Sequence, residues 1–113
     1  MQVIYNPKCS KCQGLEKALD SNEVTWEKVL YLNGLTMEKV QAIFEDYEGD
    51  WRELVREKES VFQDEGVNPK EMSENDMVAF LAKHPIAIQR PLVLKNKTVI
   101  IARDDIGIQK SID

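Results

Sequence analysis

The chain has 113 residues, 42% of them apolar and 31% charged, and a formal net charge of −5 at pH 7. A globular domain of this length can bury one hydrophobic core. The excess of acidic residues argues against binding to nucleic acid or to an anionic membrane surface.

No segment of the sequence is typical of export or of membrane insertion. The first residues lack the charged stretch followed by an apolar run that defines a signal peptide. No apolar stretch approaches the ~20 residues of a membrane span. We therefore expect a monomeric cytoplasmic protein, in a compartment where persistent disulfides are rare.

The N-terminal segment predicts a strand, a helix and a second strand. Gln2–Tyr5 is a short β-type run that stops at Asn6-Pro7, and residues 24–31 are rich in β-branched and aromatic side chains. Between them, Ser10–Ser21 has helical periodicity. This order favours two parallel strands joined by the helix. The apolar stripe of the helix consists of Cys12, Leu15, Ala18 and Leu19.

The middle of the chain is predicted to be helical. Thr36 and Ser73 are N-cap residue types, and each precedes a stretch of helical periodicity. Asp50, with a glutamate three positions later, has the spacing of a capping box and predicts a short helix through about Arg56. The two longer helices would have apolar faces made of Val40, Ile43, Phe44 and Tyr47, and of Met77, Phe80, Leu81 and His84.

The C-terminal segment predicts a hairpin and a last helix. Two apolar runs, 91–95 and 98–102, are separated by Asn96-Lys97, and Asp104 and Asp105 then open a short helix. The whole order is βαβ, a helical segment near 33–86, and ββα. We therefore predict an α/β protein of thioredoxin-like fold, a single domain over 1–113 with a mixed four-stranded sheet and an inserted helical segment.

Both cysteines of the chain lie in Cys9-Ser10-Lys11-Cys12, after the first strand and at the start of the first helix. Backbone N–H groups and the helix dipole favour a thiolate there, so a thiol pKa of about 8.5 can fall to about 3.5–7.5. Lys8 and Lys11 add positive charge beside Cys9. Residues three apart on a helical turn are also within disulfide reach, so Cys12 can attack a bond that Cys9 has formed. We expect Cys9 to be the reactive thiol and Cys12 the more buried one.

Three other interpretations of this cysteine pair are open. A structural disulfide would close a very short loop and constrain the unfolded chain little. A zinc site would need two more ligands, but the chain has no other cysteine and one histidine, so we predict no metal. Two inert thiols would pack as small apolar groups. A C-x-x-C motif between a strand and a helix favours the redox interpretation.

Three arginines lie beside predicted elements: Arg56 near the end of a short helix, Arg90 before Pro91, and Arg103 after the second hairpin strand. With the stretches around them, the sequence resembles the glutaredoxin-type arsenate reductases, the ArsC family, from about residue 3 to residue 108. The matching stretches are Ile4-Tyr5-Asn6-Pro7-Lys8-Cys9, Leu30-Tyr31-Leu32, Leu54-Val55-Arg56, His84-Pro85-Ile86, Arg90-Pro91-Leu92-Val93 and Ala102-Arg103.

The resemblance implies an enzyme that reduces arsenate. Cys9 then takes the catalytic position, Arg56, Arg90 and Arg103 hold the oxyanion, and Pro91 is a cis-proline. A second thiol, from Cys12 or from glutathione, would resolve the adduct, with glutaredoxin or thioredoxin as electron donor and no bound cofactor. Guanidinium groups suit this role, because they stay charged and present forked donors to an oxyanion.

The resemblance leaves two alternatives. Cys12, Gln13 and Tyr5 differ from the residues of the best-known reductases, and a C-x-x-C motif also occurs in a sister branch, the Spx transcriptional regulators that bind RNA polymerase. Arg103, and a chain that stops soon after the last helix, favour the enzyme. The second alternative is a thiol reductase of the same family that has no arsenate activity.

Overall fold

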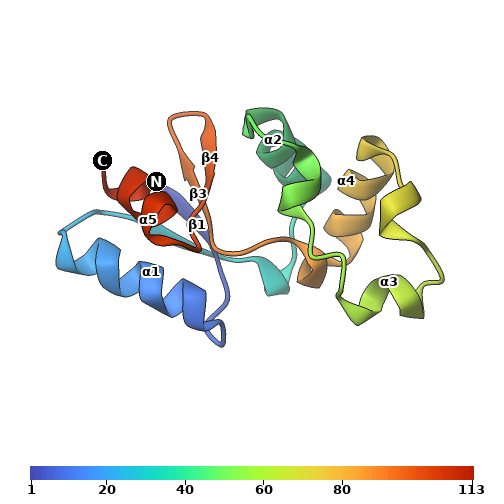
Figure 1. Cartoon of the computed structure of the whole chain (residues 1–113), viewed down its shortest axis with the longest axis horizontal. Coiled ribbons are helices and arrows are strands. Elements are labelled where there is room, and N and C mark those ends of the chain that lie inside the picture. The colour runs from blue at the N-terminus through green and yellow to red at the C-terminus, as the bar shows by residue number, and fades with distance from the viewer. The chain divides into compact units, whose positions relative to one another are not determined.

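The computed structural model describes all residues, 1–113, and divides the chain into two units. One unit, called the sheet unit below, consists of residues 1–31 and 90–113; the other, the helical unit, consists of residues 32–89. Figure 1 labels the longer elements of both units.

The sheet unit contains a four-stranded mixed sheet with the order β2-β1-β3-β4. The central strand β1 runs parallel to β2 and antiparallel to β3, and β3 pairs antiparallel with β4. Helix α1 connects the two parallel strands, and α5 follows the hairpin (Figure 1). The predicted thioredoxin-like α/β fold is therefore confirmed. The bounds are β1 Gln2–Tyr5, α1 Ser10–Ser21, β2 Glu27–Leu30, β3 Leu92–Lys95, β4 Thr98–Ile101 and α5 Asp105–Ile112.

The sheet register brings four chain segments to one edge of the sheet, here called the site edge. Tyr5, the last residue of β1, pairs with Leu30, the last residue of β2. Leu92, the first residue of β3, pairs with Ile4 of β1 and with Ile101, the last residue of β4. The residues that follow β1, β2 and β4 and those that precede β3 therefore lie at the same edge.

The core of the sheet unit lies between the sheet and α1. Alternate residues of a strand face the same side, so Val3 and Tyr5 share a face of β1. That face packs against the predicted stripe of α1, and Ile108 and Ile112 of α5 are partly buried against the same cluster. The cluster consists of Val3, Tyr5, Cys12, Leu15, Leu19, Val93 and Ala102. Helix α1, which begins next to Cys9, is thus fixed on the sheet by its own apolar side.

The helical unit contains three α-helices and several turns of 3₁₀ helix. Thr36 and Ser73 cap α2 and α4 as predicted, accepting hydrogen bonds of 3.1 Å from the backbone N–H groups of Lys39 and Asp76. A short helix, α3, was not predicted. The bounds are α2 Met37–Asp46, α3 Ser60–Asp64 and α4 Glu74–Lys83, with 3₁₀ turns at Trp51–Leu54, Pro69–Glu71 and Pro85–Ala87 and a further turn, Tyr31–Asn33, at the junction with β2.

Two predicted elements are shorter in the structure. The second strand was expected over 24–31, but Glu27 pairs with Gln2, so residues 24–26 lie beyond the end of the β1 ladder. The helix expected from Asp50 through about Arg56 is a 3₁₀ turn that ends at Leu54. Val55 instead forms a β-bridge with Ile88, which pulls the chain into an extended conformation before Arg56.

None of the helices is both long and apolar enough to cross a membrane.

Candidate active site

The loop between β1 and α1 is held by hydrogen bonds of its own. The side-chain oxygen Oδ1 of Asn6 accepts from the backbone N–H of Lys8 at 2.9 Å, and the Asn6 carbonyl accepts from the backbone N–H of Cys9 at 3.0 Å. Gln13, one turn into α1, donates from Nε2 to the carbonyl of Pro7 at 2.7 Å. Asparagine is favoured in such turns because its side chain replaces a backbone acceptor. The loop therefore fixes the position of Cys9 at the site edge.

Cys9 is the N-cap residue of α1 and is partly exposed. The backbone N–H groups of Lys11 and Cys12, in the first turn of the helix, lie close to its sulfur and have no carbonyl partner within the helix. Partial burial alone would raise the pKa of the Cys9 thiol. The backbone N–H and the thiol of Cys12, the backbone N–H of Lys11 and the charge of Arg90 outweigh burial and lower that pKa below its ordinary value.

Cys12 has the opposite character. It is fully buried in the core beneath α1, and neither cysteine is in a disulfide. Burial raises the pKa of the Cys12 thiol to about 12, and the proximity of Cys9 adds to the effect, although the Asn6 backbone and Arg90 oppose it. The sequence expectation of an exposed reactive thiol and a buried neutral one thus agrees with the surroundings of the two side chains.

Arg90 lies at the site edge, two residues before β3, and is buried with 8% of its surface exposed. The peptide bond between Arg90 and Pro91 is cis. The charge of Arg90 acts to lower the pKa of both cysteines; for Cys9 it adds to the effect of the backbone N–H groups, and for Cys12 burial outweighs it. A carbon of that guanidinium lies 5.8 Å from the centre of the Tyr31 ring, within the range of a cation–π contact.

Arg103 follows β4 at the same edge and is half-buried. Its Nη1 donates a hydrogen bond to the backbone carbonyl of Arg90. The sheet register explains this contact, because Arg90 and Arg103 flank the paired residues Leu92 and Ile101. The sheet thereby brings together two of the three arginines named from the sequence, and Cys9 lies at the same edge.

Arg56 belongs to the helical unit. There its Nε forms an ion pair with Glu59 at 3.0 Å, and its backbone N–H donates to the carbonyl of Ala87 at 2.8 Å. A contact between Arg56 and an oxyanion at Cys9 stays a prediction.

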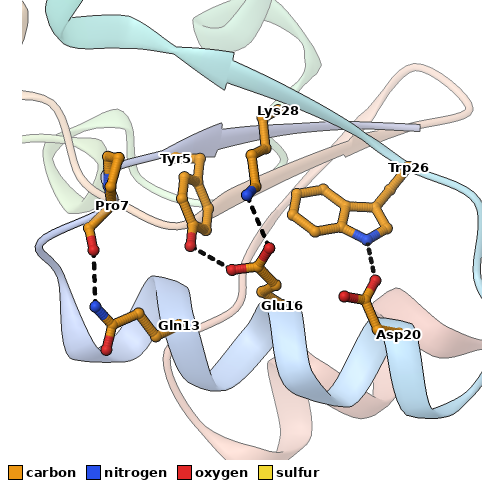
Figure 2. A network of polar contacts seen from close by, with 7 residues as sticks. All are labelled: Tyr5, Pro7, Gln13, Glu16, Asp20, Trp26 and Lys28. Carbon is orange, nitrogen blue, oxygen red and sulfur yellow. Dashed lines mark hydrogen bonds and ion pairs between the residues drawn. The ribbon is translucent and has the colours of Figure 1, made fainter.

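A polar network ties α1 to the two parallel strands (Figure 2). Tyr5 donates from its hydroxyl to Oε1 of Glu16, and Lys28 of β2 pairs with Oε2 of the same carboxylate at 2.8 Å. The hydrogen bond to Glu16, followed by burial, raises the pKa of Tyr5 to about 12, so the phenol stays neutral. Trp26 donates from Nε1 to Asp20 at 2.8 Å further along the helix. Each of these contacts holds α1, and so its N-terminus, in place.

Sequence reasoning missed two residues of this site, Asn6 and Tyr31. Asn6 is 8% exposed, and its Nδ2 donates to the Tyr31 hydroxyl at 3.2 Å. The Asn-Pro pair before Cys9 could have indicated the turn, because asparagine with its side chain on the backbone is typical of such loops. No local signal marks Tyr31, because its contacts depend on the pairing of β1 with β2.

Comparison with known proteins identifies relatives over almost the whole chain. The model of the ArsC family matches residues 4–111. Global transcriptional regulator Spx 2 of Bacillus anthracis is 28% identical over 112 residues, which cover 97% of this chain and 86% of the relative.

Solved structures have the same fold. The structure of a protein from Yersinia pestis superposes with a TM-score of 0.84 at 22% identity and covers 96% of this chain and 97% of that one. An arsenate reductase from Vibrio cholerae has a TM-score of 0.80 at 23% identity, with 99% and 96% covered. A family match over residues 4–111, together with this fold, shows that the chain belongs to the ArsC family.

Proposed function

We propose that the protein is a thiol oxidoreductase that reduces a small tetrahedral oxyanion, with arsenate as the first candidate. The observation that carries the proposal is the contrast between the two thiols: the surroundings of Cys9 lower its pKa, whereas those of Cys12 raise its pKa. A nucleophile whose thiolate form is favoured, beside a protonated thiol in reserve, suits a two-step thiol reduction.

In the first step, the Cys9 thiolate attacks the arsenic of arsenate. A sulfur–arsenic bond forms, and one arsenate oxygen leaves as water after protonation. Arg90 and Arg103 come from the two sides of the hairpin at this edge, and we assign them to the arsenate oxygens, together with Arg56. Guanidinium groups present forked donors that match a tetrahedral oxyanion and offset the charge that develops during attack.

In the second step, another thiolate attacks the Cys9 sulfur. A disulfide forms, the sulfur–arsenic bond breaks with its electron pair left on arsenic, and As(V) becomes As(III), which departs as arsenite. Cys12 lies three residues from Cys9 and is the nearest candidate for this attack; its thiol must lose a proton first, against the burial that raises its pKa. Glutathione is the alternative attacking thiol, and glutaredoxin or thioredoxin then reduces the resulting disulfide.

A coupled assay tests this proposal. Arsenate-dependent oxidation of NADPH is measured with glutathione, glutaredoxin and glutathione reductase, and separately with thioredoxin and its reductase. We expect turnover with at least one donor and none in Cys9→Ser. Turnover with neither donor would leave the protein outside the arsenate reductases.

A second candidate is a redox-sensing regulator. It is supported by the 28% identity to an Spx protein over 112 residues and by the C-x-x-C motif that the chain shares with that branch. The redox state of Cys9 and Cys12 would then control binding to RNA polymerase. Binding of the purified chain to RNA polymerase, measured after reduction and after oxidation, separates this function from the first. A redox-dependent complex without arsenate turnover would favour the regulator.

A further inference from the structure

A buried tyrosine connects the cysteine loop with Arg90. Tyr31 directly follows β2 at the site edge, and none of its surface is exposed. Its hydroxyl accepts the 3.2 Å hydrogen bond from Nδ2 of Asn6, and its ring faces the Arg90 guanidinium at 5.8 Å. One side chain therefore contacts both the segment that carries the nucleophile and a cation beside it.

Asn6 transmits the contact to Cys9. While Nδ2 donates to Tyr31, Oδ1 of the same amide accepts from the backbone N–H of Lys8, and the Asn6 carbonyl accepts from that of Cys9. The two side-chain bonds fix the amide plane at both ends. Loss of the Tyr31 hydroxyl would leave a buried amide N–H without this acceptor, and a buried donor regains a partner only if the side chain or the loop moves.

The chemistry of Tyr31 suits both contacts at once. Burial raises the pKa of Tyr31, although the hydrogen bond from Asn6 and the charge of Arg90 act in the other direction. The side chain is therefore a neutral phenol over the whole neutral pH range. Its oxygen accepts a hydrogen bond, and the negative face of its ring attracts the guanidinium.

We propose that Tyr31 is a positioning residue for the Cys9 site, with two separable parts. The hydroxyl, through Asn6, holds the loop so that Cys9 stays against the N–H groups at the start of α1. The ring supports the guanidinium of Arg90. The inference rests on the proposed function in one respect, because it takes Cys9 as the nucleophile.

The test separates the hydroxyl from the ring by two substitutions and two readouts. The first readout is the pH at which iodoacetamide alkylation of Cys9 is half-maximal, followed by peptide mapping. The second is the degree to which inorganic phosphate, a tetrahedral oxyanion that thiols do not reduce, protects Cys9 from alkylation. Tyr31→Phe removes the hydroxyl alone, and we expect it to raise the Cys9 midpoint by about half a pH unit. Tyr31→Leu should raise the midpoint similarly and also weaken protection by phosphate about threefold.

Two further variants serve as companions. Asn6→Ala should raise the midpoint at least as much as Tyr31→Phe, because it also removes the acceptor of the Lys8 N–H. The double variant should shift no further than Asn6→Ala alone, because the Tyr31 hydroxyl acts through Asn6. If Tyr31→Phe fails to fold, Asn6→Ala is used for the test in its place. Tyr47→Phe is the matched control, because it removes a hydroxyl that donates to Glu53 at 2.8 Å within the helical unit. It should leave both readouts unchanged.

The outcomes separate the inference from the proposed function. A low wild-type midpoint that Tyr31→Phe and Asn6→Ala both leave in place would overturn the role of Tyr31 alone. Additive shifts in the double variant would also overturn it, because the two side chains would then act independently. A wild-type Cys9 midpoint at the ordinary thiol value would overturn the proposed function, and with it the inference.

Discussion

Cys9 and Cys12 are three positions apart, yet opposite surroundings act on the two sulfurs. Cys9 lies beside the N–H groups at the start of α1, whereas Cys12 is enclosed by the apolar residues beneath the helix. The difference follows from helical geometry, because the first turn exposes its N–H groups and the next residue of the stripe faces the core. The sequence was sufficient to predict this contrast.

Alkylation of the two thiols should therefore depend on pH in different ways. We expect Cys9 in the wild-type protein to react half-maximally below pH ~8.5, the value of a free cysteine, because its thiolate is favoured. In Cys12→Ala the Cys9 midpoint should rise, since the hydrogen bond from the Cys12 thiol contributes to the lowered pKa of Cys9 and alanine has no donor. In Cys9→Ser the remaining thiol should react only above pH ~8.5, because burial holds its pKa high. Equal midpoints for Cys9 and Cys12 would contradict the assignment of their roles.

Of the site arginines, Arg90 is the one whose loss we expect to weaken stabilisation of the oxyanion most. Arg90→Ala should cost about 2–4 kcal/mol of transition-state stabilisation, measured as the fall in kcat/KM for arsenate. It should also raise the Cys9 midpoint, because the arginine charge lowers that pKa. Arg90→Lys should restore part of the activity, since an ammonium keeps the charge but not the fork.

Arg52→Ala is the control for this change. Arg52 is exposed and packs over the Trp51 ring at 4.3 Å, so its removal should leave kcat/KM within twofold of wild type, the size of a change of about 0.4 kcal/mol. An Arg90→Ala protein with a normal kcat/KM would show that the oxyanion is held elsewhere.

At the level of elements, the sequence predicted the bounds of those helices and strands that depend on local side-chain patterns alone. The bounds of β1 and α1 agree with the prediction, because alternation and the apolar stripe are complete within each element. The length of β2 depends on a partner far away in the sequence, and the turn before Arg56 depends on the bridge of Val55 to Ile88. A five-residue helix such as α3 is too short for periodicity to reveal.

The close approach of α5 to the end of β4 explains a glycine in the first turn of that helix. Gly107 is buried, and a side-chain carbon there would overlap the carbonyl oxygen of Ile101 and lie 3.0 Å from the Cα of Ala102. Its backbone N–H also donates to Oδ1 of the N-cap residue Asp104 at 2.8 Å. The contact holds the segment from which Arg103 emerges.

Gly107→Ala should therefore destabilise the protein by about 1–3 kcal/mol, because overlap with the backbone outweighs the better helix propensity of alanine. Gly14→Ala is the matched control on α1, where the added carbon meets nothing within 4 Å. It should stabilise the protein by roughly 0.5–1 kcal/mol. Denaturant unfolding gives both values. A Gly107→Ala protein as stable as wild type would refute the close packing of α5.

At the scale of the whole molecule, the topology of the sheet determines which residues come together at the site. Cys9 could be named from its own motif, but Arg90 and Arg103 could be assigned to the same site only through a family resemblance, since no local pattern links residues so far apart. The sheet register places Cys9, Arg90 and Arg103 at one edge. The same register creates the contact between Asn6 and Tyr31, which no sequence motif predicted. The role of Arg56, the electron donor and the monomeric state stay predictions.

The chemistry proposed for this edge requires that two thiols lose two electrons in one event. The most direct measurement is a single turnover of fully reduced protein with arsenate, in the absence of any other thiol. The account predicts arsenite in proportion to protein, together with a Cys9–Cys12 disulfide seen by mass spectrometry, and no arsenite from Cys9→Ser. Arsenite formed only after glutathione is added would move resolution to the external thiol. Two free cysteines and no arsenite, with or without glutathione, would contradict the account.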